Sequence, residues 1–133
     1  IGGVAGHSFK YHPPDTSAYF GLAQIIRNVS AVTGACLMTR RSVFEEVGGF
    51  DERLRVACND IDFCLKLRQS GKVVLYSPLS RLCHHESATR RAAHPAGDEA
   101  LMEVRWGSVL RRDPYYSPHL TLHFEDYRLG KWP

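Results

Sequence analysis

The sequence predicts a layered fold of helices and strands, of the α/β or α+β class, and its 133 residues suit one modest domain. Three observations predict this class. Apolar residues recur at helical spacing over 59–71, two apolar runs at 31–40 and 72–78 have the length of strands, and hydrophobic residues make up 44% of the chain, enough for a core. Neither repeats nor low-complexity segments interrupt this pattern.

The first third of the chain is expected to open with a loop, because 1–17 is rich in Gly, His and Pro, with a short strand at Gly3–Ala5. Apolar residues at helical spacing predict a helix over Ala18–Asn28. The apolar run 31–40 is expected to form a buried strand. Gly34 interrupts it, and the missing side chain allows an unusual backbone angle or the close approach of a ligand.

Two helices with recognisable ends are predicted next. The first is a short helix that Ser42 caps, with Glu45 at the capping-box position and Gly48 just past its end. The second begins at Asn59, a favourable N-cap residue, and ends at Gly71. The connection between them is expected to be a loop.

The second half of the chain alternates again between strand and helix. A strand is predicted over 72–78, where Pro78 stops it, and a second short strand over 80–85. A polar loop then leads to a helix over 98–112. The remaining residues, 113–133, are expected to form an irregular tail.

Charge and cysteine usage exclude several classes of function. The net charge of +3 is mild, and Lys and Arg are dispersed, which does not fit a nucleic-acid-binding protein. No apolar run approaches the roughly 20 residues that span a bilayer. The four cysteines include no CxxC pair and are predicted to be reduced, with Cys36 and Cys64 in apolar contexts typical of buried thiols. We therefore expect a cytoplasmic protein, with attachment to the inner face of the cell membrane left open.

Two carboxylates, Asp60 and Asp62, stand at the start of the predicted helix 59–71. Acidic side chains in a first turn offset the partial positive charge there and stabilise a helix by about 0.3–1 kcal/mol. One carboxylate suffices for that purpose. The pair therefore also fits a general base with an orienting neighbour, or a pair of metal ligands.

Two histidines, His84 and His85, follow Cys83 where a strand is expected to end. Neighbours on a strand point to opposite faces, so only one of the two would serve a given metal. A structural zinc site usually shows paired ligands at short spacing, which this stretch lacks. The arginine pairs 40–41 and 90–91 fit either a solvated surface or the recognition of a diphosphate.

Three stretches, taken in order, resemble one family. They are VTGACLMTRRSVFEEVGGFDE, NDIDFCLKLRQSG and SPLSRLCHHESATR, which fall within 31–90. Their order, spacing and wording resemble the C-terminal half of a family 2 glycosyltransferase with a GT-A fold, and the flanks GGVAGH and DPYYSPHLTL resemble its bacterial branch that builds cell-surface polysaccharides. The resemblance implies a small mixed sheet with flanking helices. It also implies that 1–133 is a single partial domain, the acceptor-side half, without the nucleotide-binding half.

The resemblance also implies roles for individual residues. Family members move a sugar from a nucleotide-sugar donor to an acceptor hydroxyl, and most invert the anomeric centre. Asp60 matches the general base that takes the proton of the acceptor. Asn59 stands where many members have Glu, and Asp62 supports the start of the helix; both count among the substrate-binding positions. Gly34 and Ala35 match a turn that approaches the donor sugar or the acceptor.

The stretch after Cys83 supplies the remaining implied positions. His84 matches a ligand of the divalent metal, Mn²⁺ or Mg²⁺, that neutralises the departing diphosphate. Glu86, Ser87 and Arg90 match a loop near the donor phosphates, with Arg90 as the direct phosphate contact. The implied partners are a nucleotide-sugar donor and a glycan or lipid-linked acceptor, without nucleic acid.

Two further expectations follow from the resemblance to half a domain. The isolated chain would lack turnover, and exposed strand edges would favour a homodimer by edge pairing or swapping. A rival interpretation is a non-catalytic module of the same fold that binds carbohydrate or nucleotide-sugar. A third is a small interaction domain stabilised by zinc.

Overall fold

A computed structural model gives the structure of the chain and describes residues 6–13, 15–55, 57–83 and 96–130. Within these residues, the regular structure consists of two short strands, three α-helices and two 3-10 turns. In chain order the elements are η1 (Tyr19–Gly21), β1 (Arg27–Val29), η2 (Gly34–Cys36), α1 (Arg41–Glu46), α2 (Asn59–Gln69), β2 (Val74–Tyr76) and α3 (Ala96–Arg111). The mixture of helices and strands that the sequence predicts is confirmed.

The sheet has two antiparallel strands, and one of its faces packs against α2. β1 and β2 pair in the register Arg27–Tyr76, Asn28–Leu75 and Val29–Val74. Val29 and Val74 point into the core, whereas Asn28 and Leu75 point to the exposed face. This alternation follows from the two-residue period of a strand.

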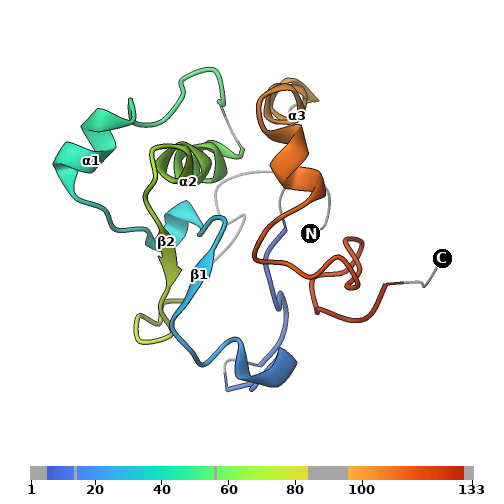
Figure 1. Ribbon diagram of the computed structural model, residues 1–133. Helices are drawn as coiled ribbons and strands as arrows, with labels where there is room; N and C mark the ends of the chain where they lie inside the picture. The colour runs from blue at the N-terminus through green and yellow to red at the C-terminus, as the bar shows by residue number, and fades with distance from the viewer. Residues whose placement is uncertain (1–5, 14, 56, 84–95, 131–133) are drawn as a thin grey trace.

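Helix α2 lies at the centre of the molecule, between the sheet and α3 (Figure 1). It contributes to two hydrophobic clusters. Phe63, Cys64 and Leu67 pack with Val74 of β2. Leu65 faces the other way and joins the second cluster, whose further buried members are Leu54, Cys58, Met102 and Trp106. The core therefore fixes α2 from both sides.

The two ends of α2 are built differently. At its C-terminus Gly71 adopts a φ of 79°, and the amides of Gly71 and Lys72 donate to the carbonyls of Arg68 and Leu67. This is a Schellman ending, as the glycine predicts. The N-terminal prediction is wrong by one position. Cys58, with a φ of 65° and no side-chain cap, precedes the helix, and Asn59 is already helical.

The expected helix over Ala18–Asn28 is wrong. Left-handed φ angles at Ala18 and Phe20 break the helical path, so only the 3-10 turn η1 forms before β1 begins at Arg27. The expected strand over 31–40 is also wrong. There the Thr33 side chain accepts a hydrogen bond from the amide of Ala35 and starts the 3-10 turn η2.

Other predictions hold with corrections. The short helix α1 is confirmed, but it begins at Arg41, so Ser42 lies inside it, and Glu45 pairs with Arg41 instead of forming a capping box. The predicted strand 72–78 is confirmed as the shorter β2, and the predicted helix 98–112 as α3. Residues 80–83 form no strand. Gly3–Ala5 and the rest of the second short strand, His84 and His85, lie outside the described residues.

The cysteines partly match expectation. All four are free, as predicted for reduced thiols. Cys64 is buried, but Cys36 is exposed, because the turn η2 carries it to the surface in place of the expected strand. Cys58 is the second buried thiol.

The described part of the tail, 113–130, contains no helix or strand, apart from a single bridge between Leu120 and Leu129. It is held to the opening segment by aromatic rings. Phe9 stacks on Tyr127 with 4.6 Å between ring centroids, and Tyr116 contacts the same ring. The hydroxyls of Ser8 and Tyr127 lie 3.0 Å apart. The two ends of the described chain thus pack together.

Candidate active site

The structure brings together two residues that the sequence singles out, Asp60 and Gly34. Asp60 lies in the first turn of α2 and is half-buried. The amide of Gly34 donates to its Oδ2 at 2.7 Å, and the amide of Ile61 donates to its Oδ1 at 2.9 Å. Each carboxylate oxygen therefore accepts one backbone hydrogen bond, and the orientation of the carboxylate is set across 26 positions of sequence.

Only a glycine fits at position 34 without a shift of its neighbour. A Cβ atom there would lie 3.2 Å from the Cβ of Asp60 and 3.5 Å from its Oδ2. Thr33 fixes the turn itself, since its hydroxyl accepts the amide of Ala35 at 3.3 Å. The backbone approaches Asp60 closely because no side chain separates them, which is the close approach that a glycine permits.

A groove of about 1000 Å³ runs past this turn. Its wall includes Gly34 and Ala35, and both strands of the sheet contribute to it. The opening segment, through residues 6–9, forms another part of the wall. A groove of this volume is at the upper end of the range for small-molecule sites, roughly 300–1,000 Å³.

Asn59 is used within the fold. Its side-chain amide donates to the carbonyl of Leu54 at 2.9 Å, which ties the preceding loop to the start of α2. A second bond supports the same loop, because the amide of Ala57 donates to Asp98 of α3 at 2.9 Å. These two contacts fix the loop that precedes α2, and with it the start of the helix that carries Asp60.

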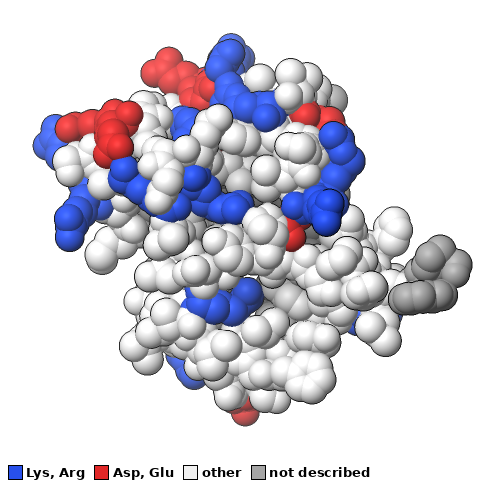
Figure 2. Space-filling view, in the orientation of Figure 1, with Lys and Arg blue, Asp and Glu red and all other residues white. Residues whose placement is uncertain are grey.

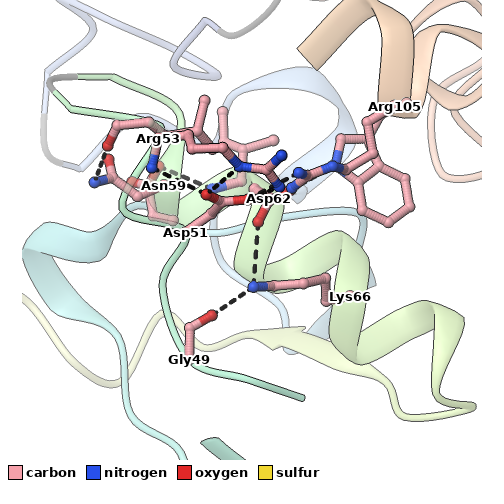
Figure 3. A network of polar contacts seen from close by, with 11 residues as sticks. Gly49, Asp51, Arg53, Asn59, Asp62, Lys66 and Arg105 are labelled. Atoms are coloured by element: carbon pink, nitrogen blue, oxygen red, sulfur yellow. Dashed lines mark hydrogen bonds and ion pairs between the residues drawn. The ribbon is translucent and has the colours of Figure 1, made fainter. Parts of the chain in front are cut away.

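Asp62 is completely buried. Figure 3 shows the side chains of Arg105 and Lys66 beside it. Its Oδ1 accepts from Arg105 at 2.5 Å and from the indole of Trp106 at 2.8 Å. The ammonium of Lys66 lies 3.3 Å from Oδ2, an ion-pair distance without hydrogen-bond geometry, and donates to the carbonyl of Gly49. The carboxylate is therefore enclosed by the protein, and the structure does not place it beside Asp60 and Gly34.

Asp51 extends this polar network into the loop after α1. Arg53 and Arg105 each donate to it, with Oδ2 at 2.8 Å from both guanidinium groups. The hydrogen bonds from Arg53, and then the one from Arg105, hold the pKa of Asp51 well below its usual range. Asp51, followed by Asp62, raises the pKa of Arg105. Asp51 and Arg105 therefore form an ion pair at all ordinary pH values.

Sequence reasoning missed the members of this network other than Asp62. Arg105 and Trp106 belong to α3 and lie 43 and 44 positions after Asp62 in the sequence. Their side chains carry no spacing pattern that pairs them with α2. Only the fold brings them together.

The predicted metal and phosphate positions, His84, Glu86, Ser87 and Arg90, lie outside the described residues. Among the residues that are described, no three side chains of His, Cys, Asp or Glu converge as a metal site would require. The metal ligand and the phosphate contacts accordingly remain predictions. Likewise, no described helix is both long and apolar enough to cross a bilayer.

Charged side chains are spread over the surface. Figure 2 shows Lys and Arg at several places over the upper part of this face, with Asp and Glu between them, while the lower part is largely uncharged. The distribution agrees with the dispersed basic residues of the sequence.

The chain is similar in sequence to segments of an O-antigen biosynthesis protein and of two proteins named as glycosyl- or rhamnosyltransferases. It is 44% identical over 135 residues to the O-antigen biosynthesis protein RfbC of Myxococcus xanthus, covering 98% of this chain and 11% of that protein. An N-acetylglucosaminyl-diphospho-decaprenol L-rhamnosyltransferase of Mycobacterium tuberculosis is 37% identical over 96 residues, which cover 64% of this chain and 31% of the relative.

A third relative carries no function in its name. The uncharacterized protein y4gI of Sinorhizobium fredii is 39% identical over 138 residues, 98% of this chain and 15% of that protein. The chain therefore spans less than a third of the length of each of these relatives. No family model and no solved structure matches it.

Proposed function

We propose that the chain is the acceptor-side half of a family 2 glycosyltransferase domain of the GT-A fold, which moves a sugar from a nucleotide-sugar donor to an acceptor hydroxyl in cell-surface polysaccharide synthesis. The observation that carries the proposal is the hydrogen bond from Gly34 to Asp60 beside a groove. It unites two positions that the family resemblance marks independently. The similarity to RfbC and to the rhamnosyltransferase supports the same class of enzyme.

In this proposal Asp60 acts as the general base of an inverting transfer. Its carboxylate accepts the proton of the acceptor hydroxyl while that oxygen forms a bond to C1 of the donor sugar. The bond from C1 to the diphosphate breaks on the opposite face, and the nucleoside diphosphate leaves. Each carboxylate oxygen has two lone pairs, so the bonds from Gly34 and Ile61 leave one on each oxygen to accept this proton.

The leaving group needs stabilisation that the proposal assigns to the stretch after Cys83. Arg90, near Glu86 and Ser87, would pair with the donor phosphates through a guanidinium shaped for two oxygens. His84 would hold a divalent metal, Mn²⁺ or Mg²⁺, since imidazole is a suitable ligand type, and the metal would neutralise the charge that develops on the diphosphate. Asn59 and Asp62 support the helix start that presents Asp60.

The relatives suggest which substrates to try first. One is named as the transferase of an L-rhamnosyl group to N-acetylglucosaminyl-diphospho-decaprenol. A lipid-linked or glycan acceptor and a rhamnosyl or hexosyl donor are therefore the proposed partners. The isolated chain is further proposed to pair as a homodimer, because among the described residues each of the two strands pairs only with the other, and a partner strand could add at its second edge.

The direct test is release of nucleoside diphosphate by the full-length protein, supplied with a panel of nucleotide sugars and Mn²⁺ or Mg²⁺. Asp60→Asn keeps the shape of the side chain and removes the base, so activity should fall by about 10²–10⁴-fold. Asp15→Asn is the matched control, because Asp15 is exposed and its variant should turn over at the wild-type rate.

The outcomes separate the proposed enzyme from its rival. Loss of activity in Asp60→Asn alone supports the base and identifies the donor. Equal activity of the two variants removes Asp60 from the chemistry. A full-length protein that binds a donor or a glycan without turning it over instead favours the non-catalytic binding module.

A further inference from the structure

One side chain joins three separate segments of the molecule. Arg105 of α3 donates through Nη1 to Asp62 of α2 at 2.5 Å and through Nη2 to Asp51, in the loop after α1, at 2.8 Å. Figure 3 shows the guanidinium beside both carboxylates. An arginine suits this role because its planar fork presents fixed donors in two directions.

The segment that Arg105 grips also carries the candidate base. Asp62 and Asp60 belong to the same first turn of α2, where the amide of Asp62 already closes a backbone bond to Cys58 at 2.8 Å. A hydrogen-bonded turn moves as a unit. Fixing the carboxylate of Asp62 against α3 therefore fixes the direction in which Asp60 leaves the helix.

On the other side of this turn, Asp60 and Gly34 are packed closely together. Asp60 meets the amide of Gly34 at 2.7 Å, and a single added carbon at Gly34 would lie 3.2 Å from the Cβ of Asp60. A small rotation of the first turn would either open the hydrogen bond or press the two residues together. The angle of the turn thus decides whether Asp60 meets the Gly34 turn.

We propose that Arg105 is a positioning residue, which through Asp62 holds the first turn of α2 at the angle where Asp60 engages Gly34. Its catalytic consequence rests on the proposed function, but its structural consequence does not. Trp106 supports the same carboxylate from α3, and Lys66 supports it from within α2. Arg105 alone among the residues of this network links Asp62 to Asp51 in the part of the chain that the structure describes.

The molecule offers a matched control in Arg53. Its Nη2 lies 2.8 Å from the same Oδ2 of Asp51, the distance that Arg105 shows. Its side chain is 69% exposed, against 24% for Arg105, and within the described residues its guanidinium donates hydrogen bonds only to Asp51. Replacing Arg53 removes a guanidinium from Asp51 and leaves the grip on Asp62 in place.

The first experiment measures amide hydrogen exchange by mass spectrometry in the full-length protein, for peptides that cover 33–37 and 58–64. Arg105→Met should speed exchange in both peptides several-fold, whereas Arg53→Met should leave both at the wild-type rate. Arg105→Lys, which keeps one charge but loses the fork, should lie between and covers the case in which Arg105→Met fails to fold. Unchanged exchange at 33–37 in both Arg105 variants overturns the proposal.

The second experiment is a kinetic cycle with Asp60. Arg105→Met should lower kcat about tenfold or more at an unchanged donor KM, as expected when a reacting group is misplaced. In the Asp60→Asn background the same change should cost nothing further. Independent, multiplying losses would overturn the proposal. A wild-type protein without turnover would sink the proposed function, and the exchange measurement would still decide the role of Arg105.

Discussion

The two carboxylates of the first turn of α2, Asp60 and Asp62, lie in different environments. Asp62 is completely buried and meets an arginine, a lysine and an indole. Asp60 is half-buried and accepts hydrogen bonds from two backbone amides. Residues two apart on a helix point about 200° from one another, which separates the two environments. One turn of helix thus supports the fold on one side and leaves a carboxylate available on the other.

Loss of the buried carboxylate should have the largest effect on stability. Asp62→Ala removes the buried carboxylate that pairs with Lys66 and with Arg105, which keeps only Asp51, and should lower the free energy of unfolding by about 3–5 kcal/mol. Asp60→Ala, on the other side of the turn, should cost about 1 kcal/mol or less. Urea unfolding followed by the fluorescence of Trp106, in a Trp132→Phe background, measures both. Equal losses would erase the proposed difference between the two sides.

The thiols next to these two regions, Cys58 and Cys36, should also differ in their rate of alkylation, by about 100-fold. Cys58, at the start of α2, is buried, and desolvation raises its pKa to about 11 from 9.0, so its thiolate fraction at pH 8 is about 100-fold smaller than that of an ordinary thiol. Cys36, in the Gly34 turn, is exposed. Iodoacetamide at pH 8 should therefore label Cys36 long before Cys58. Comparable labelling rates in the folded protein would contradict the burial of Cys58.

The same thiol gives a dependence of stability on pH. Because folding favours the neutral form of Cys58, its contribution is fully present below pH 9.0 and is lost as the pH rises through about 11. Replacing Cys58 by Ala should flatten this loss. Unfolding free energies measured at pH 8 and at pH 10.5 provide the comparison.

The smallest change, a single methyl group, should act on the Gly34 side alone. Gly34→Ala places a carbon 3.2 Å from the Cβ of Asp60 and should lower kcat about tenfold, with a change in unfolding free energy below about 1 kcal/mol. Gly97→Ala is the control, since a Cβ there meets nothing within 4 Å. Full activity in Gly34→Ala would mean that the spacing to Asp60 is not critical for turnover.

The sequence predicts well what local chemistry decides. Gly71 ends α2 because its left-handed φ of 79° suits a glycine, and β2 follows from a run of apolar residues before Pro78. The sequence also points to the helix that carries Asp60 and to Gly34, although it predicts a strand where the structure has a turn. The contact between them is a finding of the fold.

The sequence fails where distant residues decide. β1 forms at 27–29 because β2, which follows α2 in the sequence, supplies its hydrogen-bonding partner. The apolar spacing of 18–28, which predicts a helix, carries no information about this distant partner. The partners of Asp62 come from α3, which no spacing rule connects to α2. Tertiary pairing of this kind overrides local propensity.

The aromatic contact between the two ends of the described chain has a consequence for folding. Ser8 and Tyr127, whose hydroxyls meet at 3.0 Å, are 119 positions apart, so their pairing closes a very long loop. Such closures cost chain entropy and slow folding when they must form early. Because synthesis proceeds from the N-terminus, Phe9 cannot stack on Tyr127 until almost the whole described chain has been made. We expect this contact to form after the core around α2, as the last step that joins the opening segment to the rest.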